Sequence, residues 1–251
     1  MLSLNCCILA NFRYYMDMKF SYEDLISKFM TALRLRETAP KSKPEETQTY
    51  IDSFPEPFIT IARDPGSGGK LIGQEVAREL GFAFYDHELL EEIAKSTKMR
   101  QSVLNQVDEK SRTALQDLIQ GLMNPNYVSD VTYFSQLCKV ILSLAYKGKV
   151  VILGRGANFI TPFARGLHVR ITAPTQVCIQ RAIDYEGHAP EVAREIVKKY
   201  ETDRREFVRQ YFDKDIKKSD YYDLVINTTF YTPKEAAAIV TRAFKKKFNL
   251  E

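Results

Sequence analysis

A glycine cluster separates an apolar run from a helical pattern in the stretch ITIARDPGSGGKLIGQEVARELG, Ile59 to Gly81. Glycine tolerates positive φ angles and can turn several backbone N–H groups towards one anion. The first turn of the following helix would add free N–H groups and the positive end of its dipole. The stretch therefore predicts a phosphate-binding loop formed by Gly66, Ser67, Gly68, Gly69 and Lys70. The alternative is a glycine-rich turn that only lets the chain enter a helix tightly.

The loop departs in two positions from the usual phosphate-loop consensus, G-x-x-x-x-G-K-S/T. If Gly69 and Lys70 are its G-K pair, Asp64 replaces the first glycine and Leu71 replaces the hydroxyl residue. That hydroxyl normally holds Mg²⁺, so we expect any Mg²⁺ to be held mainly by water and substrate phosphates. Positive charge for the phosphates would come from Lys70 or from Arg63 at the entrance of the loop.

Charged residues also follow two other apolar runs. Asp86 follows FAFY, and Arg155 follows VVILG. Ligands of parallel α/β sheets bind at the carboxyl ends of the strands, so Asp86 and Arg155 are candidate substrate-binding residues. A guanidinium can bond a phosphate through two parallel hydrogen bonds. The alternatives are a helix N-cap for Asp86 and a structural salt bridge for Arg155.

Basic residues recur in two helical patterns further along the chain, namely Arg181, Arg204, Arg205 and Arg209. Phosphoryl transfer requires positive charge around the migrating group and exclusion of water, which a closing arginine-bearing lid provides. For any single arginine, a solvated helix face is the competing interpretation. The three histidines have no metal-ligand spacing, and no protein metal site is predicted.

Apolar runs alternate with helical patterns from residue 58 onwards. Strands are expected at 58–62, 82–86, 150–153, 167–172 and 224–227, and helices at 70–80, 87–147 with a break near 121–125, 175–184, 190–212 and 233–247. Strands that are apolar throughout and separated by helices indicate a parallel sheet covered on both faces. The predicted fold class is therefore α/β.

The first part of the chain has a different composition. Residues 21–36, SYEDLISKFMTALRLR, form an amphipathic helical pattern that could dock on a partner or on a second copy. Residues 37–57 contain four prolines and many polar side chains, which is linker composition. The expected organisation is an extension at 1–36, a linker at 37–57 and a catalytic domain at 58–251.

Composition argues against several classes of protein. The 251 residues carry a net charge of +4, from 36 basic and 32 acidic side chains, which is too small an excess to indicate nucleic acid as a partner. Four cysteines without C-x-x-C spacing favour reduced thiols in a cytoplasmic protein. The apolar start, MLSLNCCILA, is far shorter than the ~20 residues that span a bilayer, so no membrane association is expected. A lipid anchor on Cys6 and Cys7 is the alternative.

Five short motifs, in this order, resemble the cytidylate kinase-like family, a branch of the nucleoside monophosphate kinases. They are ITIARDPGSGGKLIG, FYDHELL, VVILGRGANFI, RITAP followed by Arg181, and YDLVINTT, all within residues 58–248. The resemblance implies a three-layer P-loop kinase fold with a five-stranded parallel sheet in the order 2-3-1-4-5, a helical acceptor-binding insert and a helical lid. It also implies ATP as donor, Mg²⁺, and a nucleoside monophosphate acceptor resembling CMP or dCMP.

Two positions depart from the pattern of the family. Cytidylate kinases place their loop lysine where this chain has Gly69, so Lys70 falls one position later. Their Gly-Arg-Asp motif, whose Arg and Asp contact the nucleotide, keeps Arg155 here but has Gly156 in place of Asp. Cytosine recognition is therefore the least supported part of the resemblance.

The family's lid pattern, an acidic residue followed three places on by arginine, favours Arg204 as the first catalytic candidate, followed by Arg181 and Arg205. Lys70 and Arg63 complete the expected catalytic set. Two other functions stay open: a nucleotide-binding regulator without transfer activity, and a kinase for a non-nucleotide acceptor bound by the long helical insert after Asp86.

Overall fold

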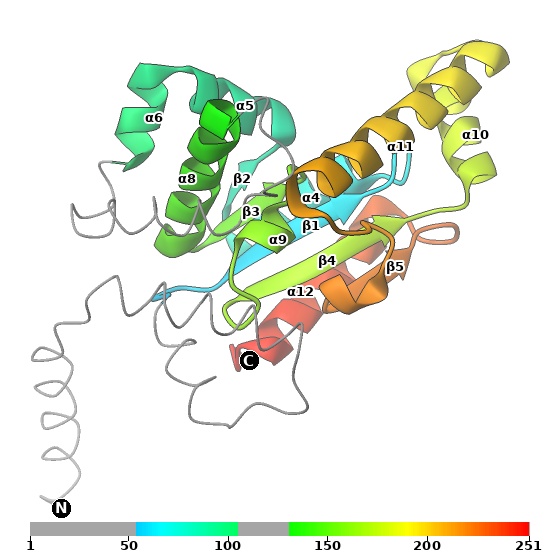
Figure 1. Ribbon diagram of the computed structural model, residues 1–251. Coiled ribbons are helices and arrows are strands. Elements are labelled where there is room, and N and C mark those ends of the chain that lie inside the picture. Colours follow the sequence, from blue (N-terminus) through cyan, green and yellow to red (C-terminus); the bar gives the residue numbers. More distant parts are fainter. Residues whose placement is uncertain (1–53, 105–130, 251) are drawn as a thin grey trace, which may run out of the picture.

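The computed structural model describes residues 54–104 and 131–250 (Figure 1). The predicted helix at 21–36, most of the predicted linker at 37–57 and the predicted helix break near 121–125 lie outside the described residues. The described part contains a twisted sheet with helices packed on both of its faces.

Five parallel strands form the sheet: β1 (Phe58–Arg63), β2 (Ala83–Tyr85), β3 (Val150–Leu153), β4 (Gly166–Thr172) and β5 (Leu224–Asn227). Their order is β2-β3-β1-β4-β5, which confirms the order implied by the family resemblance. β1 is central, with Ile61 opposite Leu153 of β3 and Val169 of β4. Because every neighbouring pair runs parallel, the carboxyl ends of all five strands lie along one edge.

Helices fill the connections: α4 (Gly69–Leu80), α5 (His87–Lys95), α6 (Thr97–Leu104), α8 (Val131–Lys147), α9 (Ala157–Ile160), α10 (Thr175–Glu186), α11 (Pro190–Phe212) and α12 (Pro233–Lys247), with a short 3₁₀ turn at Ser219–Tyr221. The helical stretch predicted from residue 87 breaks early, because Ser96 ends α5 and its hydroxyl accepts a hydrogen bond from the Met99 N–H at 3.3 Å. Hydroxyl residues at such positions begin new helices. The four-residue helix α9 was not expected from the sequence.

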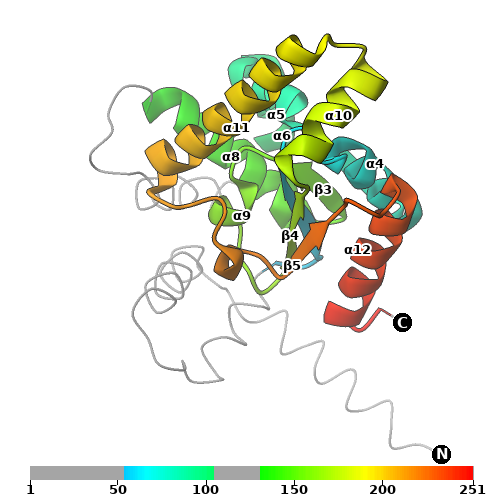
Figure 2. The ribbon, with the colours of Figure 1, turned by 90° about the vertical axis from the view of Figure 1, so that its right-hand side faces the viewer.

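The two faces of the sheet carry separate hydrophobic cores. Successive strand residues point to opposite faces, so Val150 and Ile152 pack with α5, α8 and α9, whereas Val151 and Leu153 pack with α4 and α12. Figure 2 shows α4 and α12 on one side of the sheet and α8, α9 and α11 on the other. The three-layer architecture is therefore confirmed.

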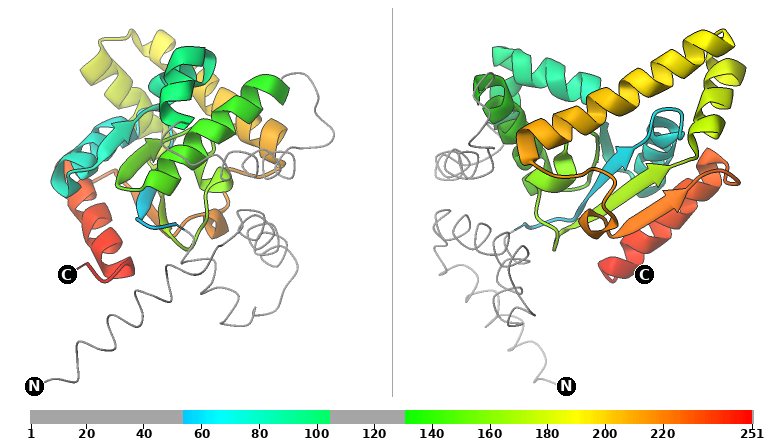
Figure 3. Two further views of the ribbon diagram at one scale, coloured as in Figure 1. Left: turned by 90° about the vertical axis from the view of Figure 1, so that its left-hand side faces the viewer. Right: turned by 45° about the vertical axis from the view of Figure 1, so that its right-hand side comes forward.

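α10 and α11 form a helical hairpin that extends beyond the sheet (Figure 3). Gly187 ends α10 with a left-handed φ of 71°, and a small cluster that includes Cys178, Ala182 and Val197 joins the two helices. The other end of α11 enters the larger core through Val208 and Phe212. Among the helices of the described residues, none has the length and hydrophobicity to cross a membrane.

The packing of the sheet domain already includes Phe54. This side chain is 5% exposed and its ring packs near those of Phe58 and Tyr146. Arg165 fixes the backbone here, because its Nε donates to the Phe54 carbonyl at 2.7 Å and its Nη2 to the Pro55 carbonyl at 3.0 Å. The residues just before β1 are therefore part of the packed domain.

Candidate active site

The glycine loop between β1 and α4 has the backbone geometry of an anion-binding turn. Gly66 and Gly68 have left-handed φ angles of 68° and 83°, and Gly68 is the N-cap of α4. A Cβ at Gly66 would lie 2.8 Å from the carbonyl oxygen of Cys178, so the close approach of α10 also requires glycine. The N–H groups of the first turn, from Gly69 to Leu71, have no intrahelical partner, so they are available as donors to an anion.

Polar side chains behind the loop fix its shape. The Ser67 hydroxyl donates to the Asp64 carbonyl at 2.8 Å, and the Asp64 carboxylate accepts hydrogen bonds from Arg170 at 3.2 Å and from the Thr172 hydroxyl. Ser67 is 1% exposed. Its hydroxyl and its backbone N–H, which donates to the same carbonyl at 3.3 Å, therefore brace the loop.

Arg181, a predicted lid arginine, also lies behind the loop. Its guanidinium donates to the Gly66 carbonyl at 3.3 Å and to the Thr228 hydroxyl and carbonyl at 3.0 and 2.6 Å. The Thr228 hydroxyl in turn donates to the Ser67 carbonyl at 2.9 Å. Arg181 thus connects the loop to the end of β5, and its hydrogen bonds hold the loop in place.

Lys70 points away from the loop towards the start of α5. Its ammonium lies 2.8 Å from a carboxylate oxygen of Asp86 and 3.2 Å from one of Glu88, and its side chain is 49% exposed. The hydrogen bonds to Asp86 and then Glu88 raise the pKa of Lys70. Asp86 is also the N-cap of α5, because its Oδ1 accepts from the Leu89 N–H at 3.0 Å. The expected alternative for Asp86, a helix cap, is therefore present in the structure.

Three arginines from three different elements meet beside the loop. The guanidinium of Arg63, at the end of β1, lies over Gly154, where any Cβ would overlap Nη1. Arg204 of α11 donates to the Arg63 carbonyl at 3.1 Å. Burial, followed by the positive charges of Arg204 and Arg155, lowers the pKa of Arg63 to about 9. Burial also lowers the pKa of Arg204. We call Arg63, Arg155 and Arg204 the arginine cluster.

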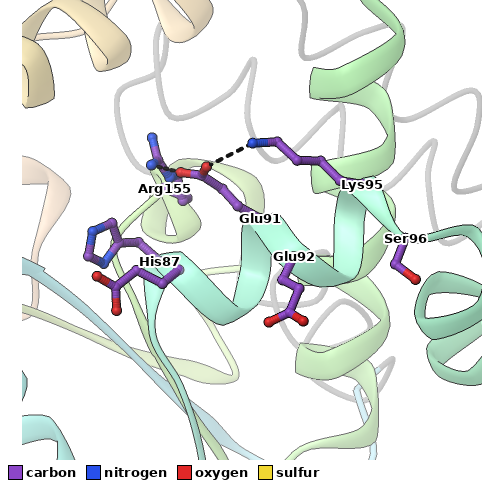
Figure 4. A pocket seen from close by; sticks show the side chains of 7 residues that line it. His87, Glu91, Glu92, Lys95, Ser96 and Arg155 are labelled. Atoms are coloured by element: carbon purple, nitrogen blue, oxygen red, sulfur yellow. Dashed lines mark hydrogen bonds and ion pairs between the residues drawn. The ribbon is translucent and has the colours of Figure 1, made fainter.

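Arg155 connects α5 to α11. It forms an ion pair with Glu91 of α5, and its guanidinium carbon lies 5.2 Å from the centre of the Phe207 ring on α11. Figure 4 shows Arg155 beside Glu91, with Lys95 further along α5. A surface pocket lies on this side of the cluster, lined by His87, Glu88, Glu91, Glu92, Lys95, Ser96 and Arg155.

His87 belongs to the site although no role was predicted for it. It faces Arg63, Arg155 and Arg204, and its buried Nδ1 has no hydrogen-bond partner among the described residues. Burial, followed by the charges of Arg63 and Arg155, lowers its pKa to about 4. The imidazole is therefore neutral at pH 7. The sequence signal that could have identified His87 is its position directly after Asp86, at the carboxyl end of β2.

The other residues singled out in the sequence lie in different environments. Arg204 is half-buried next to β1, whereas Arg205 is exposed at the surface of α11. Gly156, which replaces the family's Asp, has a left-handed φ of 65°, and a Cβ there would overlap the ring of Phe212. The aromatic ring fills the space into which a side chain at this position would extend.

The loop offers no ligand set for Mg²⁺. The Ser67 hydroxyl is committed to Asp64, and Leu71 has no oxygen in its side chain. Within residues 54–104 and 131–250, no group of three or more His, Cys, Asp or Glu side chains is arranged to hold a metal ion. The side chains of the loop therefore offer no free oxygen to a Mg²⁺ ion at the phosphates.

Two sequence comparisons find relatives of this chain. A model of the cytidylate kinase-like family matches residues 58–230. The cytidylate kinase of Ignicoccus hospitalis is 24% identical over 185 residues, which cover 73% of this chain and 96% of that protein.

Solved structures support the fold alone. A crystal structure of an uncharacterized protein from Eubacterium ventriosum has a TM-score of 0.56 at 21% identity and covers 76% of this chain and 99% of that one. The shikimate kinase of Acinetobacter baumannii is 13% identical, with 82% of this chain and 98% of that one covered, and its TM-score is 0.39. The family match spans more than half of the chain and the sheet order and glycine loop agree with it, so the protein belongs to the cytidylate kinase-like family and has the P-loop kinase fold.

Proposed function

We propose that the protein is a kinase that transfers the γ-phosphate of ATP to a nucleoside monophosphate resembling CMP or dCMP. The observation that carries this proposal is the arginine cluster. Three guanidinium groups lie close together at the end of β1 beside the glycine loop, and that of Arg155 also lines the pocket on α5. Desolvated positive charges of this kind suit the phosphates of two nucleotides and the phosphoryl group that passes between them.

In this proposal, the free N–H groups of α4 hold the donor phosphates and Arg155 holds the acceptor phosphate. Arg204 covers the migrating group from α11, and Arg181 keeps the loop in position. A lone pair on an acceptor phosphate oxygen forms the new bond to the γ-phosphorus. The bond between that phosphorus and the β,γ-bridging oxygen breaks, and its electron pair leaves with ADP. The acceptor phosphate is largely ionised at pH 7, so no catalytic base is required.

The acceptor is assigned from the family and from the activity in the name of the Ignicoccus hospitalis relative. The carboxylate of the family's Gly-Arg-Asp motif has no counterpart at Gly156, since Phe212 fills that space. Recognition of the base then falls to the polar side chains of α5, which include Glu88 and Glu92. Mg²⁺ is assigned to the nucleotide phosphates and their waters, because the loop supplies no ligand set.

The test is ADP release by the full chain with ATP and Mg²⁺ across CMP, dCMP, UMP, AMP and GMP, together with calorimetric binding of ATP. We expect turnover that is highest with a cytidine monophosphate. ATP binding without turnover on any of the five would reject the assignment and favour the regulator, or an acceptor outside the nucleotides.

A matched pair of variants tests the site itself. Arg204→Met should lower kcat by about 100-fold, the order expected when a donor to the transition state is lost. Arg209→Met, an exposed arginine of the same helix, controls for the loss of one charge from α11. Equal rates for the two variants would contradict the role given to Arg204.

A further inference from the structure

The Arg63 side chain lies in a slot between two glycines. A Cβ at Gly69, the first residue of α4, would overlap Cβ of Arg63 and lie 2.9 Å from its Cγ. A Cβ at Gly154, after β3, would overlap Nη1 and lie 3.1 Å from Cζ. The stem of Arg63 thus runs past the N-terminus of α4, and its guanidinium reaches the end of β3. Glycine at both positions leaves room for this path.

The Arg63 charge has no partner of its own in the described part of the chain. No carboxylate there forms an ion pair with Arg63, and its guanidinium donates no hydrogen bond. Asp86 and Glu88 are the acidic groups close enough to influence it, and both are ion-paired with Lys70. Two further arginines, Arg155 and Arg204, repel it. Burial of an unpaired charge is costly, and an anionic ligand is the natural compensation.

Lys70 is in the opposite situation. Two carboxylates already neutralise its ammonium, and its side chain is half exposed at the contact between α4 and α5. A phosphate at the loop would have to compete with Asp86 and Glu88 for this lysine. The same phosphate would meet Arg63 with its hydrogen-bond donors unused, in a planar group that can bond two phosphate oxygens at once.

We propose that Arg63, rather than Lys70, supplies the charge that the phosphate-loop lysine supplies in cytidylate kinases, by bonding the β- and γ-phosphates of ATP. This inference rests on the proposed function, since it presupposes that ATP binds at the glycine loop. In this arrangement the positive charge on the phosphates comes from Arg63 at the end of β1 and not from a lysine in the first turn of α4. Lys70 instead links the first turns of α4 and α5.

Arg63→Met and Lys70→Met in the full chain separate the two residues, with Arg78→Met, an exposed arginine of α4 that pairs with Glu75, as the control for charge. Each variant is measured for thermal unfolding without ligand, for calorimetric binding of ATP and AMP, and for turnover. We expect Arg63→Met to bind ATP at least about 10-fold more weakly and to lower kcat about 100-fold. AMP, which lacks the β- and γ-phosphates, should bind about as before. Lys70→Met should weaken ATP binding by no more than about threefold.

Thermal unfolding distinguishes a ligand-binding role from a structural one. Removal of a desolvated charge next to two arginines should leave the unliganded Arg63→Met protein as stable as the wild type or more stable. Arg63→Lys, which keeps the charge on a shorter group, should recover part of the ATP affinity. A less stable unliganded Arg63→Met protein would assign Arg63 a structural role and overturn the inference.

The failure of this inference is separable from that of the proposed function. A wild-type protein that binds no ATP defeats both. If the wild type binds and uses ATP, while Arg63→Met does so equally well and Lys70→Met does not, only the role of Arg63 is rejected.

Discussion

At the scale of single residues, His87 makes folding stability depend on pH. The surrounding charges are Arg63 on β1, Arg155 after β3, Arg204 on α11 and the neighbouring Glu88. The pKa of His87 is about 4 in the folded protein, against 6.5 for an ordinary histidine. The unfolded chain therefore takes up the proton first as the pH falls. Above pH 6.5, His87 does not lower the free energy of unfolding. As the pH falls from 6.5 towards 4, the free energy of unfolding decreases by on the order of 1–2 kcal/mol after solvent screening.

Chemical unfolding of the wild type and of His87→Gln between pH 7 and pH 4 measures this contribution. Other groups titrate in the same range, so the relevant quantity is the difference between the two proteins. That difference should change steadily below pH 6.5. A constant difference between wild type and His87→Gln would show that the imidazole titrates normally.

At the scale of secondary-structure elements, the contact between Gly156 and Phe212 joins the N-terminus of α9 to the C-terminal end of α11. Gly156→Ala should lower the free energy of unfolding by about 1–2 kcal/mol, because alanine is strained in the left-handed region. Overpacking against the Phe212 ring should lower it by a further ~1–3 kcal/mol. Gly187→Ala has the same kind of backbone, with a φ of 71°, but nothing within 4 Å of its Cβ position, so it should lose the strain term alone.

Denaturant unfolding of both alanine variants measures how much more stability Gly156→Ala loses than Gly187→Ala. Adding Phe212→Leu to Gly156→Ala should recover part of this additional loss. Equal losses at the two glycines would mean that the ring moves aside at little cost. The acidic residue of the family motif could then be restored at position 156, which would reopen that route to cytosine recognition.

At the scale of the whole molecule, the packed domain includes chain that has the composition of a linker. Phe54 is 5% exposed between Phe58 and Tyr146, whereas Phe230, near the carboxyl end of β5, is 93% exposed. Phe54→Ala should therefore cost about 3–5 kcal/mol, as for other buried phenylalanines, and Phe230→Ala should cost little. The melting temperatures of the two variants test this, and similar values would place the start of the packed domain after Phe54.

Local sequence signals predict the five strands, the long helices and the position of the loop, but not the end of α5 at Lys95 or the short helix α9. Continuous apolar runs can only be satisfied as buried parallel strands, and Gly66, Gly68 and Gly69 indicate a tight turn into a helix whichever ligand it binds. These signals are local, so all five strands were predicted to within one residue. The order of the strands came from the family resemblance, because apolar runs do not reveal which of them are neighbours.

Which charges meet at the site depends on how the elements pack in three dimensions. Arg204 contacts the Arg63 carbonyl across 141 positions of sequence, and its neighbour Arg205 faces solvent because α11 crosses the site with one side inward. Lys70 pairs with Asp86 because α4 and α5 begin at the same edge of the sheet. The packing of two glycines around Arg63 and the burial of His87 depend on β1, β2 and β3 ending side by side. Contacts of this kind follow from strand order and helix crossing, which residue spacing along the chain does not encode.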